Sequence, residues 1–318
     1  MSPHCQVKIV VLAACTALAP NVFAQDGAIK EVRAVLKRSE IKVGVDREKM
    51  RYVFIGSCDV KVTDPASDPK FHHKRSSCAK IAELRAKRDL MKARSVKVTL
   101  ADSTESISDG DRSIILTKSL CKFIAEDQHT GSTVLCSAES WDDQTGQYQV
   151  AVAVAWSQKL EADGGRVQVQ TADPSFDDED PEWERWVKSV NIESVFGSRQ
   201  FKDSRGFRRY VGIGSADIDG KRGKALKDAY TVAKLTAKEH LAFALYSESE
   251  SRDVAKTVLA QIQTGAIEET DAWEWFESEV IRRCKGKVLR ADMVYDSDEL
   301  KNPITGRPMF VTVYGVKR

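Results

Sequence analysis

The sequence predicts an α+β fold built from two tandem copies of one strand-helix-helix-strand-strand unit, with helices packed on one face of each sheet. Three observations support this prediction. Residues 51–60, RYVFIGSCDV, recur at 209–218 as RYVGIGSADI, with seven of ten positions identical. Each copy precedes a helical pattern with alanine at nearly every fourth position. Each half also ends in two strand-like runs joined by a turn that contains Thr-Gly.

The first helix of each half is predicted from its stripe of small residues. In the first half the stripe comprises Ala79, Ala82, Ala86, Leu90 and Ala93, and in the second half Ala225, Ala229, Ala233 and Ala237. Small side chains on one helix face allow the helix to lie close against a sheet. We therefore expect the stripes to pack on the repeated strand. The basic stretch 80–92 points away from the alanines and is interpreted as a solvated face.

A second amphipathic helix follows in each half, over residues 114–124 and 273–281. The strand that ends the first half, 147–156, alternates strictly between a bulky face and a small face. Tyr148 and Val150 begin the bulky face, while Ala151 and Ala153 lie on the other. This period of two indicates a strand packed beneath helices, and residues 309–316 are its counterpart in the second half.

The two halves are separated by a polar, acidic connector. Residues 177–180 are all acidic, and Asp180 with Pro181 provides a helix start whose inner stripe begins with Trp183 and Trp186. A similar leading helix, residues 29–36, opens the first half. The predicted organisation is a signal peptide at 1–24, a first repeat at 25–157, an acidic linker at 158–180 and a second repeat at 181–318.

The repeated strand and its alanine-rich helix resemble a small bacterial lipoprotein family that is related to the N-terminal domain of the flagellar assembly protein T. They also resemble exported bacterial families of unknown function. The resemblance covers about 45 residues of each half, from Arg51 and from Arg209. It implies an envelope-associated, non-catalytic α/β module. This chain departs from the lipoprotein family by carrying two copies of the motif.

The N-terminus has the features of a secretion signal. An apolar run from Ile9 to Ala19 is followed by Pro20 and by the small-residue site Val22-Phe23-Ala24. The run is too short to span a bilayer, and no transmembrane segment is predicted in the mature chain. The predicted location is therefore periplasmic or secreted. Alternatively, Leu12-Ala13-Ala14-Cys15 resembles the box before a lipidated cysteine, which would anchor the protein through Cys15.

The mature chain keeps five cysteines, which allow at most two internal disulfides in an oxidising compartment. Cys121 and Cys136 lie in a predicted helix and the strand after it, and they form the first candidate pair. Cys58 and Cys78 bracket the first strand-to-helix loop and form the second. Cys284 then remains as the odd thiol.

No known catalytic or cofactor motif is present. The loop after Gly212-Ile213-Gly214 has the wrong spacing for a phosphate loop, and its glycines are interpreted as permitting close helix–strand packing. His72-His73 is interpreted as a pair of solvated loop histidines. We predict no catalytic, cofactor-binding or metal residues. The near balance of 49 basic and 47 acidic residues gives no reason to expect a nucleic-acid partner.

These observations favour an exported, non-catalytic protein that binds an unknown ligand or envelope protein through its two modules. The alternative is a secreted hydrolase whose carboxylates meet between the repeats. A deep cleft with convergent carboxylates or histidines would favour the hydrolase.

The signal sequence generates a first testable prediction. Mass spectrometry of the native protein should find Gln25 as its first residue, because cleavage after Ala24 leaves an apolar core of ordinary length. Detection of a lipid-modified Cys15 as the first residue would contradict this and place the protein at a membrane surface.

Overall fold

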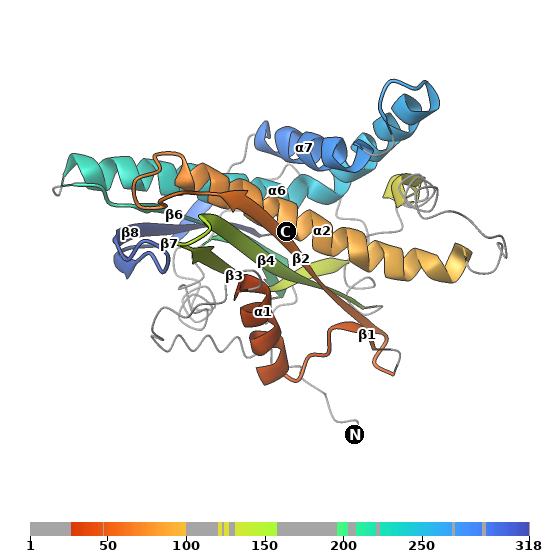
Figure 1. Ribbon diagram of the computed structural model, residues 1–318, viewed down its shortest axis with the longest axis horizontal. Coiled ribbons are helices and arrows are strands. Elements are labelled where there is room, and N and C mark those ends of the chain that lie inside the picture. Colours follow the sequence, from red (N-terminus) through yellow and green to blue (C-terminus); the bar gives the residue numbers. More distant parts are fainter. Residues whose placement is uncertain are drawn as a thin grey trace.

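The computed structural model describes residues 27–46, 48–99, 120–122, 124–126, 131–157, 196–202, 208–220, 223–268, 271–287 and 291–317. These residues form two four-stranded antiparallel sheets and the helices that pack on them (Figure 1). The predicted signal peptide, the acidic linker, the helix expected from Asp180 and most of the helix expected at 114–124 lie outside the described residues. Among the described helices, none combines the length and apolar character needed to cross a membrane.

Among the described residues, both units contain two strands, a long helix and two further strands in the same order, while α1 is described only in the first unit and α7 only in the second. The first comprises α1 (Gly27–Arg38), β1 (Gly44–Asp46), β2 (Arg51–Lys61), α2 (Phe71–Thr99), β3 (Ser132–Asp142) and β4 (Gln147–Ser157). The second comprises β5 (Gly197–Lys202), β6 (Arg208–Asp217), α6 (Lys224–Gln263), α7 (Ala272–Lys285), β7 (Asp292–Lys301) and β8 (Pro308–Lys317). Their sheet orders correspond, β1-β2-β4-β3 and β5-β6-β8-β7. Tyr52 and Tyr210 occupy equivalent strands, opposite Trp156 and Val316. The predicted α+β fold with two similar units is confirmed.

Glycines on the repeated strands allow a helix to touch the sheet backbone. A Cβ added to Gly56 would lie 2.2 Å from the carbonyl oxygen of Ala82 on α2. A Cβ added to Gly214 would lie 2.2 Å from the carbonyl oxygen of Ala233 on α6. Neither separation is compatible with a side chain. The alanine stripes therefore lie against the strands as predicted, with Ala82 and Ala233 fully buried.

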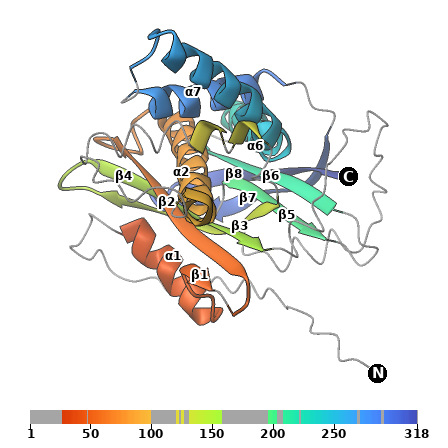
Figure 2. The same cartoon turned by 90° about the vertical axis from the view of Figure 1, so that its right-hand side faces the viewer.

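Helices cover both faces of the first sheet, so that α1 adds a second helical layer to the predicted one. α2 packs over β2 and β4, while α1 lies beneath the opposite face (Figure 2). Val32 of α1 packs with the small face of β4, which includes Ala151 and Ala153. These alanines form an apolar surface that a helix can approach closely. The edge strands β1 and β5 were not predicted, because both are short and carry little hydrophobic alternation.

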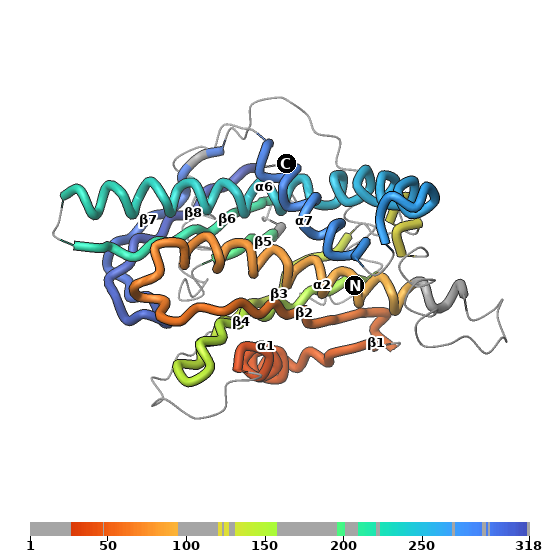
Figure 3. The backbone as a smooth tube through the Cα atoms, turned by 45° about the horizontal axis from the view of Figure 1, so that its top comes forward, coloured from red at the N-terminus to blue at the C-terminus, as the bar shows by residue number. Residues whose placement is uncertain are grey.

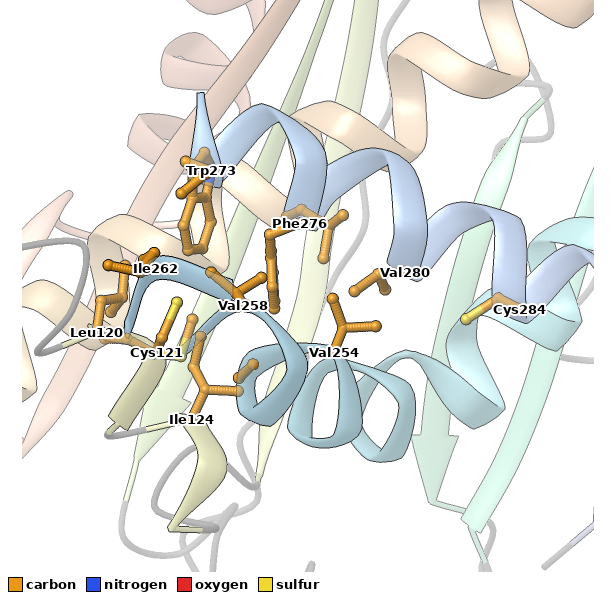
Figure 4. Packing of buried hydrophobic residues seen from close by; sticks show 14 of the residues in the cluster. Leu120, Cys121, Ile124, Val254, Val258, Ile262, Trp273, Phe276, Val280 and Cys284 are labelled. Atoms are coloured by element: carbon orange, nitrogen blue, oxygen red, sulfur yellow. The ribbon is translucent and has the colours of Figure 1, made fainter. Parts of the chain in front are cut away.

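The two sheets meet edge to edge at β3 and β5, and α2 and α6 run side by side above them (Figures 2 and 3). Side chains join the edges: Arg199 donates from Nη2 to Ser137 Oγ at 2.8 Å, and Gln200 donates from Nε2 to the Ser132 carbonyl at 2.7 Å. A shared apolar cluster joins α2, α6 and α7 with Leu120, Cys121 and Ile124 (Figure 4). The two units therefore bury part of their core against each other.

The glycine contacts generate a second prediction. Replacing Gly214 with Ala should lower the free energy of unfolding by about 1–3 kcal/mol, because α6 must move away from β6 to admit the methyl group. Urea denaturation would measure the change. The matched control is Gly286→Ala at the end of α7, where a Cβ would meet its nearest atom at 3.6 Å. Equal stability of the two variants would contradict the close approach.

Candidate functional site

A polar cleft lies where the two units meet, with a volume of about 280 Å³. The first unit contributes the loop after β2 and the start of α2. The second contributes the end of β6, the first turns of α6 and the β7–β8 turn. We call it the inter-unit cleft, and its polar lining comprises Asp68, His72, Arg75, Ser215, Asp217, Asp219, Asp228, Asn302 and Arg307. The volume is close to the roughly 300 Å³ at which small-molecule sites begin.

Arg75 forms the inner wall of the cleft and is only 4% exposed. Its guanidinium forms a two-pronged ion pair with Glu139 of β3, in which Nε donates to Oε2 at 2.8 Å. Its Nη1 donates to Ser215 Oγ of the second unit at 3.1 Å. Tyr148 donates its hydroxyl to the same Glu139 carboxylate, and burial together with that carboxylate raises the pKa of Tyr148 well above its usual range. Arg75 therefore links both units through one buried, neutralised network.

Three of the four cleft aspartates have partners within the protein. Asp68 accepts a hydrogen bond from Lys74 Nζ at 2.8 Å, and this bond is the main cause of its lowered pKa. Asp217 accepts from Asn302 Nδ2 at 2.7 Å. Both side chains are therefore bonded to neighbouring segments of the protein and help to shape the walls of the cleft.

The third aspartate, Asp219, forms an ion pair with Arg307 at the mouth of the cleft, with Oδ1 and Nη1 2.8 Å apart. Asp228 is exposed on the first turns of α6. His72 is half-buried, and burial lowers its pKa, with the neighbouring His73 adding to the effect. The lining thus contains four carboxylates, a neutral imidazole and two arginines that are already paired.

The prediction that the two histidines lie in a loop is wrong, and only His73 is solvated as predicted. Both residues lie in the first turn of α2, where His72 faces the cleft while His73 is exposed. Within the described residues, no three His, Cys, Asp or Glu side chains gather in an arrangement that could hold a metal ion.

The prediction that the basic stretch of α2 forms a solvated face is also wrong. Lys80 is 4% exposed and pairs with Glu239 of α6 at 3.1 Å. Arg85 pairs with Glu277 of α7 at 3.3 Å, and Lys87 donates to Ser247 Oγ at 3.3 Å. The face opposite the alanines of α2 is therefore a charged seam against the second unit. Its partners lie more than 150 residues away in the chain, so helical spacing alone could not reveal them.

The cysteine predictions have different outcomes. Within the described residues, Cys58, Cys78, Cys121, Cys136 and Cys284 are all buried free thiols. Cys121 lies in the apolar cluster shared by α6 and α7 (Figure 4), whereas Cys136 faces α1 beneath the first sheet. The Cys121–Cys136 bridge is therefore absent, because the sheet lies between the two cores. Of the helix expected at 114–124, the described residues Leu120, Cys121 and Ile124 pack in the cluster formed by α2, α6 and α7.

Cys58 and Cys78 do share one core, between β2 and α2. The Cys78 thiol donates to the Cys58 carbonyl oxygen at 2.9 Å. A hydrogen bond from Cys78 is the main cause of the lowered pKa of Cys58. A bridge between them under oxidising conditions stays a prediction. Cys284 is buried at the end of α7, where burial raises its pKa to about 12.

Comparisons with known proteins show a related fold. No family model and no curated protein matches the chain. A 2.3 Å crystal structure of a hypothetical protein from Francisella tularensis is similar, with a TM-score of 0.56 and 14% sequence identity. The match covers 96% of this chain and 93% of that chain. At this identity the similarity concerns the fold alone.

The Arg75 network generates a third prediction. Replacing Arg75 with Leu should lower the free energy of unfolding by about 3–5 kcal/mol, because Glu139 is left buried without its counter-ion. Thermal or urea denaturation would measure the loss. Arg282→Leu is the matched control, since its pair with Glu279 is on the surface and its removal should leave stability nearly unchanged. Similar effects of the two substitutions would contradict the central role of Arg75.

Proposed function

We propose that the protein is an exported, non-catalytic binding protein whose ligand occupies the inter-unit cleft. The observation that carries the proposal is that both units line one polar cleft of about 280 Å³, with the buried Arg75 network as its inner wall. Concave sites with a few fixed polar groups are the usual form of small-molecule sites. The proposed envelope location rests on the signal peptide predicted at residues 1–24.

The charges of the lining favour a small ligand that carries an amine or another cation. Asp217 and Asp228 lie on the wall formed by the second unit, and no arginine or lysine forms an ion pair with Asp217 among the described residues. The positive charges of Arg75 and Arg307 are neutralised by Glu139 and Asp219. A cationic ligand would therefore meet unbalanced negative charge, whereas an anionic ligand would meet repulsion.

A secreted hydrolase remains the second candidate, because His72 and four carboxylates line the same cleft. Acid–base hydrolysis needs one carboxyl group held protonated near neutral pH. Asp68 has its pKa shifted the other way by Lys74, and Asp217 is bound to Asn302 and Thr305. These partners favour binding over catalysis. Hydrolysis of any ester, amide or glycoside that Asp217→Asn abolishes would favour the enzyme.

The experiment measures thermal stabilisation of the protein by spermidine, arginine and choline, with citrate as the anionic comparison. The amines should raise the melting temperature in low salt, and citrate should leave it unchanged. The variant Ala225→Trp should abolish the response, because its indole would fill the cleft from the first turn of α6.

The matched control is Ala260→Trp, an exposed position near the other end of α6 that does not line the cleft. This variant should respond like the wild type. Equal responses of both variants, or an equal response to citrate, would contradict binding of a cation in the cleft.

A further inference from the structure

One buried histidine has no role in the cleft. His240 of α6 is only 2% exposed and lies where α6 meets α2, β3 and β5. A cavity of about 10 Å³ adjoins its ring, lined also by Glu83 of α2, Ser137 of β3 and Ser198 and Arg199 of β5. Such a space is about the smallest that admits one water molecule. His240 therefore lies on the boundary between the two units.

One nitrogen atom of the His240 ring makes no hydrogen bond within the described residues. This atom, Nε2, is fully buried. A buried polar atom without a partner costs free energy, and it costs more once the ring is charged. The surrounding structure therefore tolerates the neutral ring and offers nothing to stabilise the imidazolium.

The charged groups that face His240 also disfavour its protonation. Positive groups come from α2, namely Arg75 and Lys80, and from β5, namely Arg199. Arg199 bonds only neutral oxygens in the described residues, the Ser198 carbonyl at 2.7 Å and Ser137 Oγ at 2.8 Å. Burial first, and then these three cations, hold the pKa of His240 well below its usual range.

The nearby carboxylates are already engaged. Glu83 of α2 binds Lys87 at 2.7 Å, and Glu239, the neighbour of His240 on α6, binds Lys80 and Lys285, each at 3.1 Å. The β3 side chains that line the cavity, Val134 and Ser137, are uncharged. Glu139, the charged residue further along β3, is paired with Arg75. Accepting a proton at His240 would thus add a fourth positive charge without a free counter-ion.

We propose that His240 makes the junction between the two units sensitive to pH, holding them together as a neutral ring and separating α6 from α2 and β5 once it is protonated. Protonation requires that water reach the ring, and the adjoining cavity lies along this boundary. The units are also joined by the apolar cluster around Phe276 and by the Arg75 network, so separation is local. The inference does not depend on the ligand proposed for the cleft.

The direction of the pH effect on stability follows from the difference in proton binding between the folded and unfolded states. The folded protein binds the proton more weakly than the unfolded chain, so the stability that His240 contributes is complete above the unfolded pKa of about 6.5 and decreases below it. Between pH 7 and pH 5 the unfolding equilibrium constant should rise because of this group by up to about 25-fold, the limit reached when the folded protein binds no proton at His240. Carboxylates change stability over the same range, so the histidine must be isolated by substitution.

The test compares urea unfolding of the wild type, His240→Gln and His73→Gln at pH 7 and pH 5. The wild type and the exposed His73→Gln control should share one pH dependence. His240→Gln should lack the part of this rise that comes from the histidine, up to about 25-fold. An unchanged pH dependence in His240→Gln would overturn the proposal.

Hydrogen exchange, corrected for intrinsic rates, tests whether the change is local. At pH 5 the wild type should exchange faster at residues 76–87 of α2 and 236–247 of α6, while residues 28–36 of α1 keep their rates. Equal acceleration in α1 would show global destabilisation and overturn the local separation. If His240→Gln fails to fold, ¹³C-histidine NMR of the wild type decides. His240 titrating near pH 6.5, with α2 and α6 undisturbed, would refute the proposal.

Discussion

The structure depends on the direct contact of a helix backbone with a strand backbone in each unit. At Gly56 in the first unit, and at Gly212 and Gly214 in the second, the missing side chain lets α2 and α6 rest against the middle of their sheets. The alanines on each helix extend that contact along its length. Close packing of this kind gains dispersion energy and excludes water, but it leaves no room for even one methyl group. Each unit is thereby held to one helix position.

That position brings the opposite face of α2 against the second unit. Its charged residues therefore become buried at the seam, where Lys80 and Arg85 each meet a carboxylate from α6 or α7. Buried ion pairs add little net stability, because desolvation offsets their attraction. They do penalise any other arrangement, since a shifted helix would leave a charge without its partner. The seam thus specifies how the two units meet, while the apolar cluster around Phe276 buries side chains from both units.

The inter-unit cleft is a product of the same arrangement. Equivalent strands end at the same side of the molecule, and the loops that follow β2 and β6 come together there. The copies have diverged at this end: Cys58 corresponds to Ala216, and Arg75 reaches across to Ser215. Because each unit provides one wall, the cleft exists only in the duplicated protein.

The sequence by itself determined the local elements and their repetition. The strand over 51–60, the alanine stripes and the alternation in 147–156 appear in the structure because periodicity encodes which face of an element is buried. Tertiary structure alone decided what each exposed face meets. The sequence pattern predicts a solvated basic face on α2, but Glu239 and Glu277 of the second unit pair with it in the structure. Chain spacing predicts that Cys121 and Cys136 lie close together, but the first sheet separates their two clusters. Local spacing specifies orientation around an element, whereas long-range pairing depends on how elements far apart in the chain pack together.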